Sequence, residues 1–417
     1  MTVELSHLDM KRAIESLRSG VPSSAAVDAV GSGQEQLSDR FRDLLKRADQ
    51  KAAEGSQCRG LMIRAGFGEG KSHLLTAFEH IALEQSYAVS RLVISKETPL
   101  NVPAKLLVSA VENLRVPGAI GRGLDEVGLL LRKRFQSPEY DGLMEQLKQG
   151  KLDHRFAVTL HIFKDAIHDE EIIDRVLRFW SGESFGVSEL KRIMRDLGIA
   201  DFRLESMKAR ELALQTFTFL PMMLRAAGLR GLVILVDELE LIGRYGKVAR
   251  GQSYAELARW FGALEQEQRP GLVTVGAITS DFERDVLIDK GDLDNMALFI
   301  GTRNVNPSHA ELGMRMIQGA ELLVEHDEAL LKKAYVTLRH LHSRAYNWEA
   351  PDVVWPEVLG ATPMRTFVRA WINAWDVRRI YNVAADQDGY EICTVKEDYR
   401  ESPELEAADR DSENEAK

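Results

Sequence analysis

Residues 65–72 read Ala-Gly-Phe-Gly-Glu-Gly-Lys-Ser. An apolar run at 59–65 leads into this stretch, and a segment with helical periodicity follows at 72–84. A phosphate-binding loop has the pattern Gly, four residues, Gly-Lys-Ser/Thr, placed between a strand and a helix. Here Ala65 stands where the pattern has its first glycine. The stretch therefore predicts a strand, a phosphate-binding loop and a helix, which is the start of a parallel α/β unit.

The loop contains the residue types that triphosphate binding requires. Gly68 and Gly70 let the backbone turn and present N–H groups without an obstructing Cβ, and the following helix adds its N-terminus. Lys71 can reach the β- and γ-phosphate oxygens, and the Ser72 hydroxyl can ligate Mg²⁺. We expect ATP or a closely related nucleoside triphosphate to bind here. The expected contacts are Gly66, Phe67, Gly68, Glu69, Gly70, Lys71, Ser72 and His73.

A second motif supplies acids at the end of a buried strand. Residues 232–238 read Leu-Val-Ile-Leu-Val-Asp-Glu, five apolar residues followed by two carboxylates. Open α/β sheets bind ligands at the carboxyl ends of their strands. Asp237 is expected to hold Mg²⁺ through water, and Glu238 to orient and polarise the attacking water. The pair predicts hydrolysis of ATP to ADP and phosphate rather than binding alone.

Other candidates follow later strands. The strand at 271–278 leads to Thr279 and Ser280, whose hydroxyls could sense the γ-phosphate, although an ordinary strand end explains them equally well. Arg365 begins a C-terminal helix and is a candidate lid residue over the nucleotide. Arg284 and Arg303 are candidates to act in trans on a second subunit, with a surface role as the alternative for each.

The apolar patterns divide the 417 residues into four regions. An N-terminal helical segment is expected at 1–50, an ATPase core at 51–305, a C-terminal helical lid at 306–385 and an acidic, disordered tail at 386–417. The core is interrupted by a charged, strand-poor stretch at about 98–228, which predicts a large helical insertion. Further strands are expected at 87–95 and 231–236 and, more weakly, at 297–305; further helices are expected at 309–325, 328–344 and 363–381.

Composition limits the class of protein. The net charge is −10, and residues 397–417 carry nine acidic and three basic residues, so the other 396 residues carry only −4. A nearly neutral body shows no basic excess of the kind common in nucleic-acid proteins. The two cysteines are far apart, and no apolar run reaches 18 residues, so we expect a cytoplasmic protein with no membrane span. His154, His161 and His168 are spaced by seven, and without a fourth ligand they do not predict a metal site.

Several stretches together resemble the BrxD family of ATP-binding proteins from BREX phage-defence systems. The similar stretches are RAIESLRSGVP at 12–22, FGEGKSHLL at 67–75, VISKETPL at 93–100, VILVDELE at 233–240, NPSHAELGMRMIQGAE at 306–321 and TPMRTFVRAWINAWD at 362–376. The resemblance runs from Lys11 to Tyr381. The loop and acid motifs are shared by many P-loop ATPases, whereas the segments that begin at Val93, Asn306 and Thr362 are specific to this family.

The resemblance implies an AAA+-like ATPase with a parallel central sheet, related to origin-recognition and transposition-regulator ATPases. It implies a subunit of an antiviral system that blocks phage DNA replication and marks host DNA by methylation. Duplex or forked DNA, a helicase or another defence component, and further copies of this chain are the implied partners. It also assigns Lys71 and Ser72 to phosphate and Mg²⁺, Asp237 and Glu238 to metal and catalysis, and Arg365 to the lid.

Two functions remain open from the sequence. The first is an ATP-driven switch that assembles on DNA or on a DNA-processing partner and hydrolyses ATP as it cycles. The second is a non-motor scaffold, in which ATP stabilises an oligomer and the helical insertion docks partners. Glu238 favours the first, and the nearly neutral body together with the large insertion keeps the second open.

Overall fold

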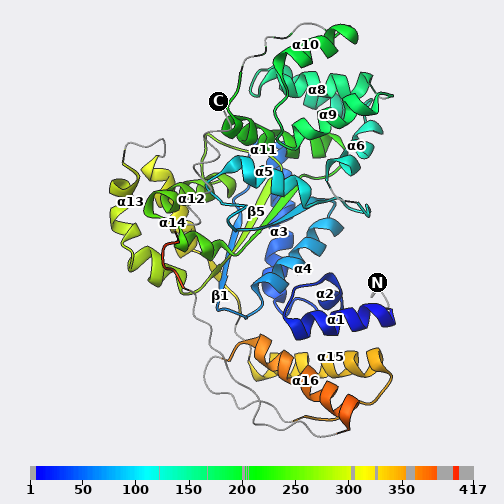
Figure 1. Ribbon diagram of the computed structural model, residues 1–417, viewed down its shortest axis with the longest axis vertical. Coiled ribbons are helices and arrows are strands. Elements are labelled where there is room, and N and C mark those ends of the chain that lie inside the picture. The colour runs from blue at the N-terminus through cyan, green and yellow to red at the C-terminus, as the bar shows by residue number, and fades with distance from the viewer. Residues whose placement is uncertain are drawn as a thin grey trace.

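A six-stranded sheet forms the centre of the computed structural model (Figure 1). The structure describes residues 6–121, 123–166, 168–199, 202, 204, 206–301, 306–324, 327–353, 362–382 and 398–402. The strands are β1 (Leu61–Ala65), β2 (Ala88–Val93), β3 (Leu114–Arg115), β4 (Leu232–Asp237), β5 (Leu272–Thr279) and β6 (Glu321–Leu322). Their order is β3-β2-β4-β5-β1-β6, and all neighbours are parallel except β2 and β3.

The strand order brings the two motifs to one edge of the sheet. β5 lies between β1, which leads into the glycine-rich loop, and β4, which ends at Asp237. Ala65 pairs with Thr279 at the ends of β1 and β5, and Val93 pairs with Asp237 at the ends of β2 and β4. Because parallel strands end at the same edge, residues separated by more than 140 positions in the sequence become neighbours.

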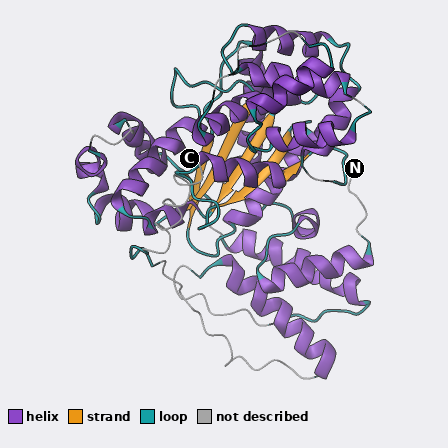
Figure 2. Cartoon of the chain, turned by 45° about the horizontal axis from the view of Figure 1, so that its top comes forward, coloured by secondary structure: helices purple, strands orange, loops and turns teal. Residues whose placement is uncertain are grey.

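Helices cover both faces of the sheet (Figure 2). All of β4 is buried, and its side chains alternate between two cores. Val233 and Leu235 pack with α3 (Glu35–Ala53) and α4 (Lys71–Glu84), while Ile234 and Val236 belong to the larger core on the other face. A strand buried on both faces explains the unbroken apolar run in the sequence.

The stretch expected as a helical insertion forms one end of the molecule, where Figure 1 labels α6, α8, α9 and α10. Its helices are α5 (Pro103–Glu112), α6 (Leu124–Arg132), α7 (Pro138–Lys148), α8 (His154–Asp165), α9 (Glu170–Trp180), α10 (Val187–Asp196) and α11 (Ala209–Ala226). Ser137 caps α7, and Pro138 follows at its first turn, which favours a helix start. Phe156, Phe179 and Trp180 are fully buried, and their core is continuous with that of the sheet.

Five elements flank the sheet beside β5. These are η1 (Leu239–Arg244), α12 (Lys247–Trp260), η2 (Glu283–Ile288), α13 (Asp292–Ile300) and α14 (Pro307–Gln318). The weak strand expected at 297–305 is wrong up to Ile300, because α13 buries Met296 and Ile300 closely against Gly251. Residues 302–305 lie outside the described residues. The helix expected at 309–325 ends at Gln318, and β6 follows it at the sheet edge.

The helices expected as a C-terminal lid and the first two helices of the chain form one helical unit at the other end of the molecule (Figure 1), which we call the lid unit. α1 (His7–Ser19) and α2 (Ser24–Val30) share an apolar core with α15 (Glu328–Tyr346) and α16 (Met364–Tyr381). The region expected as an N-terminal segment at 1–50 therefore divides, since α3 packs on the sheet. The region expected as a lid at 306–385 also divides, since α14 and β6 lie with the core.

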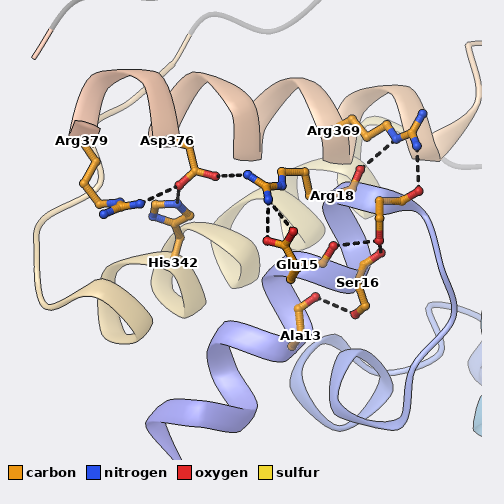
Figure 3. A network of polar contacts seen from close by, with 9 residues as sticks. Ala13, Glu15, Ser16, Arg18, His342, Arg369, Asp376 and Arg379 are labelled. Carbon is orange, nitrogen blue, oxygen red and sulfur yellow. Dashed lines mark hydrogen bonds and ion pairs between the residues drawn. The ribbon is translucent and has the colours of Figure 1, made fainter. Parts of the chain in front are cut away.

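Polar contacts join α1 to the lid helices (Figure 3). Asp376 accepts from His342 Nε2 at 3.2 Å, from Arg379 at 3.2 Å and from Arg18 at 3.4 Å. Trp348 donates to His342 Nδ1, which leaves the ring proton on Nε2, facing Asp376. Burial opposes the charge of Asp376, but the hydrogen bonds from His342 and Arg379 outweigh it and lower the pKa of this carboxyl.

Composition predicted a disordered acidic tail at 386–417, but part of this region is ordered. Residues 398–402 are bound to the core, where the Tyr399 side chain is 8% exposed. The segments 383–397 and 403–417 lie outside the described residues. Composition indicated a solvated terminus because it averages over the whole tail, whereas binding here depends on contacts of one five-residue segment, which include the Tyr399 side chain and the Glu401 ion pair.

Asp376→Asn is expected to lower the free energy of unfolding by about 2 kcal/mol at pH 7, because it leaves buried donors facing a neutral group. The pKa of Asp376 is lowered by folding from the ordinary value of 3.8, so its stabilisation is present above that value and is lost as the pH falls through the folded pKa. Chemical unfolding at pH 7 and below pH 4 measures both effects. Asp39→Asn, which breaks an exposed ion pair with Arg42, is the matched control; equal losses in the two variants would contradict the prediction.

Candidate nucleotide site

The glycine-rich loop has the backbone that a phosphate cradle needs. Gly68 and Gly70 have φ values of +80° and +99°, in the region that side-chain-bearing residues rarely adopt, and Gly70 caps the N-terminus of α4. Ala65 ends β1 as a fully buried strand residue paired with Thr279. An alanine fits there because the position is extended, so the departure from the usual glycine leaves the turn unchanged.

Lys71 is held at the base of the loop and is 8% exposed. Its ammonium donates to the carbonyl oxygens of Ala65 and Gly66, at 3.3 Å each, and lies 3.8 Å from a carboxylate oxygen of Glu240. The Glu69 carboxylate folds back and accepts from the Gly66 N–H at 2.7 Å. The loop thus already binds an anion of its own, which is the electrostatic property that phosphate binding requires.

The two expected metal ligands lie on either side of an arginine that the sequence analysis did not single out. Arg91 on β2 donates through Nη2 to Asp237 Oδ2 at 2.7 Å and to the Ser72 carbonyl at 3.1 Å. Asp237 is buried, so the guanidinium supplies the cation that a buried carboxylate needs. Ser72 and Asp237 offer hydroxyl and carboxylate oxygens, the ligand types that Mg²⁺ takes together with phosphate and water.

Glu238 has an unusual backbone at the mouth of the site. Its φ and ψ are 58° and 35°, a left-handed conformation in which a non-glycine residue is strained. Its N–H donates to Asp237 Oδ1 at 3.1 Å, and its side chain lines the cavity described below. The turn therefore directs the two successive acids differently, Asp237 into the sheet edge and Glu238 toward the cavity.

Glu240 is a further acid of the site that sequence reasoning missed. It is 2% exposed, faces Lys71, and its second carboxylate oxygen is buried without a hydrogen-bond partner. Burial raises the pKa of Glu240 to about 8; Lys71 opposes this shift, and Glu238 and Asp237 add to it. The signal in the sequence was the third acid of the Asp-Glu-Leu-Glu stretch, two residues after the expected catalytic pair.

A cavity of about 250 Å³ opens from the loop between the core and the lid unit. Glu238 and Glu240 line its core side, and the chain between α1 and α3 with helices α15 and α16 lines the other. Its apolar lining residues are Leu17, Val21, Pro22, Ala26, Val30, Phe67, Val324, Leu330, Ala334, Leu338, Met364 and Val368. A polar, anion-binding floor beneath apolar walls suits a ligand with phosphates at one end and a flat apolar ring at the other.

Arg365 ties the lid unit to the loop. Its backbone N–H donates to the Gly68 carbonyl at 3.4 Å, and its guanidinium lies 5.6 Å from the Phe67 ring centroid and donates to the Gly20 carbonyl at 2.7 Å. Burial lowers the pKa of Arg365, and neighbouring Arg369 adds to this. On the core side, His73 of α4 contacts the Gly31 carbonyl at 2.7 Å. The loop is thus held by the N-terminal and C-terminal parts of the lid unit at once.

The remaining candidates differ in their placement. Thr279 is buried at the end of β5, beside Ala65, and its hydroxyl bonds the Tyr399 hydroxyl at 2.6 Å. Ser280 is exposed, and its N–H donates to the Ala65 carbonyl. Arg284 is exposed on η2 and pairs with Asp285, and Arg303 lies outside the described residues.

Two kinds of feature are absent from the described part of the chain. No group of three or more His, Cys, Asp or Glu side chains there is arranged to hold a metal ion, so the spaced histidines do not form one with such neighbours. No helix in the same residues is long and apolar enough to cross a membrane.

Comparison with protein families gives one match. The model of the family described as BREX system ATP-binding protein BrxC/D matches residues 5–118 and 138–291, which include the glycine-rich loop and both acids of the 237–238 pair. The match does not distinguish BrxC from BrxD. Neither the curated proteins nor the solved structures contain a significant match.

The pH dependence of stability tests the surroundings of Glu240. The ordinary pKa is 4.5 and the folded one about 8, so between these values the folded chain holds a proton that the unfolded chain has lost. Stability therefore falls as pH rises through this window, by up to about 1.4 kcal/mol per pH unit. Glu240→Gln is expected to remove this fall. Urea unfolding from pH 5 to pH 8 measures it, with exposed Glu265→Gln as the control. Parallel pH curves for wild type and Glu240→Gln would refute the assignment.

Proposed function

The chain belongs to the BREX system ATP-binding protein BrxC/D family, and on that premise we propose that it is a Mg²⁺-dependent ATPase of AAA+ type, working as an ATP-driven switch in BREX defence. Membership of the family supports ATP binding and a role in BREX defence. The observation that carries the proposal of hydrolysis is the convergence of Lys71, Asp237 and Glu238 at one edge of the sheet, where Lys71 and Glu238 line one cavity and the Glu238 N–H donates to Asp237.

The proposed roles follow from where these side chains lie. The N–H groups of the loop and the Lys71 ammonium bind the phosphates and stabilise the charge that develops during phosphoryl transfer. Ser72 and Asp237 would hold Mg²⁺, which when bound neutralises charge on the phosphate oxygens. Glu238 faces the cavity and orients the attacking water as general base. Arg365 would contact the phosphates from the lid.

The arrangement of the lid supports the switch. Arg365 contacts the loop with its backbone and Gly20 with its guanidinium, so a ligand that attracts the guanidinium would compete with the Gly20 carbonyl. Because α1, α2, α15 and α16 share one core, a change at Gly20 would move the unit as a body. A binding event of a few atoms would in this way be converted into a movement of four helices.

The finer identity and the partners are proposals that rest on the resemblance. We place the chain with BrxD rather than BrxC, in the cytoplasm, acting on duplex or forked DNA or with a helicase or another defence component. Self-association is also proposed, with Arg284 or Arg303 reaching the site of a neighbouring copy. The exposure of Arg284 supports that reach.

A scaffold whose assembly is controlled by ATP with little hydrolysis remains the second candidate. The observation that favours it is the Arg91–Asp237 ion pair, which gives Asp237 a cation in the absence of a metal ion. The extended helical region from α5 to α11 offers a surface for partners. The two candidates differ in turnover and not in binding.

Lys71→Ala is expected to abolish ATP binding, because it removes the buried ammonium that meets the phosphates. Glu238→Gln is expected to bind ATP as tightly as wild type and to lower the turnover number by about 100-fold or more, because the general base is lost. Phosphate release is measured with no DNA and with single-stranded, duplex and forked DNA, and binding is measured by displacement of a fluorescent nucleotide.

Exposed Glu265→Gln makes the same carboxylate-to-amide change away from the site, and it should leave both the turnover number and the ATP affinity unchanged. Turnover in the wild type no higher than in Lys71→Ala, under every DNA condition, would overturn the switch. If ATP still promoted assembly of Glu238→Gln in that case, the scaffold would be favoured.

Arg91→Ala tests the metal site. Without metal the variant should lose about 3 kcal/mol of stability, since Asp237 keeps a buried charge without its cation. Bound Mg²⁺ would return a cation to Asp237, so adding Mg²⁺ to the ADP-bound protein should raise the melting temperature more in Arg91→Ala than in wild type. Arg12→Ala, which breaks an exposed pair with Asp9, is the control. Equal Mg²⁺-induced shifts in all three proteins would place the metal elsewhere.

A further inference from the structure

Residues 398–402 lie against the core beside the nucleotide site, although the sequence gives no reason to place them there. The Tyr399 ring contacts Phe282 edge-on, with ring centroids 5.8 Å apart. It also lies so close to Gly243 of η1 that a Cβ at that glycine would be 2.6 Å from the ring. The ring therefore occupies a fitted recess between the segment that follows the acids and the segment that follows β5.

Polar contacts anchor the same segment on both sides of the ring. Glu401 pairs with Arg250 at 2.9 Å, and Arg250 is itself buried and fixed by Asp292 at 2.7 Å. Lys290 donates to the carbonyls of Tyr399 and Gly243. The Ser402 N–H donates to the Arg244 carbonyl at 3.0 Å. Segment 398–402 is thus bound by backbone and side chains, and its aromatic residue points at the end of β5.

The hydrogen bonds of Tyr399 have a defined direction. Its hydroxyl donates to Asp281 Oδ1 at 3.0 Å, since an ionised carboxylate can only accept. A phenol has one proton, so in the 2.6 Å contact with Thr279 the Tyr399 oxygen must accept. The single hydroxyl proton of Thr279 is therefore directed at Tyr399. Thr279 cannot donate to a phosphate oxygen while this contact lasts.

We propose that Tyr399 is a positioning residue whose hydroxyl oxygen accepts the hydroxyl proton of Thr279. Segment 398–402 therefore competes with the γ-phosphate for the hydrogen bond that Thr279 donates. The inference rests on the proposed function together with the expectation from the sequence that Thr279 senses the γ-phosphate; Thr279 lies at the end of β5, next to Ala65 of the loop. ATP supplies a competing acceptor for the Thr279 proton, and ADP does not. ATP, but not ADP, therefore weakens the hold on segment 398–402.

The proposal also links segment 398–402 to Glu238 and Glu240. Segment 398–402 contacts η1 at Gly243 and Arg244, and η1 begins directly after Glu238 and contains Glu240. Burial raises the pKa of the Tyr399 hydroxyl, so the phenol keeps the proton that it donates to Asp281. Release of the segment frees one side of the turn that carries the catalytic acids, so occupancy by a triphosphate is reported at a surface outside the cavity.

Hydrogen–deuterium exchange on the full chain tests the competition. The probes are the β,γ-imido analogue of ATP and ADP, each with Mg²⁺, and the readout is the exchange rate of peptides that contain residues 398–402. The analogue is expected to speed exchange of these peptides, and ADP to leave it as in the nucleotide-free protein. Unchanged or slower exchange with bound analogue overturns the proposal. Binding of both nucleotides is measured separately, and failure of both to bind overturns the proposed function and this inference with it.

Variants separate positioning from a merely structural role. Tyr399→Phe keeps the ring and removes the competing hydroxyl, so the analogue should bind about five-fold more tightly and ADP as before. Glu401→Gln weakens the anchor to Arg250, away from the cavity, and should act in the same direction. Glu265→Gln is the control and should change neither affinity. Equal changes for analogue and ADP in Tyr399→Phe, or no change for either, would show that Tyr399 only packs against the core.

Discussion

The site depends on the cost of burying charge without a partner. Lys71 and Asp237 are buried at the carboxyl edge of the sheet, where an unpaired charge is expensive. Each is balanced by a group of the protein. Backbone carbonyls and Glu240 surround the ammonium, and Arg91 holds Asp237. Glu69 fills the anion position of the loop, and Tyr399 takes the hydroxyl of Thr279. In each pair one member would face a triphosphate or its metal, and the other takes that place in the free protein.

This internal pairing couples the affinity for a ligand to movement of the paired groups. A ligand gains only the difference between its own contacts and those it replaces, so binding and rearrangement are parts of one equilibrium. In our proposals the Arg365–Gly20 contact would connect that exchange to the lid unit, and the Thr279–Tyr399 contact would connect it to segment 398–402. The His342–Asp376–Arg18 contacts keep the lid unit together, so it can respond as one body.

Local patterns in the sequence were sufficient for the elements that carry the chemistry. The apolar run before Asp237, the glycines of the loop and the helical periodicity after Lys71 correspond to β4, the turn and α4. Patterns failed where an apolar stretch had two interpretations. The run ending at Ile300 has the composition of a strand, and its burial against Gly251 makes it a helix. The two-residue strands β3 and β6 are too short to give any periodic signal.

The sequence by itself determined the residue types and the local turn, because a glycine-rich loop between a strand and a helix and an acid-ended buried strand are properties of neighbouring residues. The tertiary structure alone decided which distant groups meet. Arg91 and Asp237 lie 146 positions apart, Thr279 and Tyr399 120, and Gly20 and Arg365 345. No local propensity specifies such pairs. The first follows from the strand order, which places β2 beside β4, and all three satisfy the need of buried polar groups for a partner.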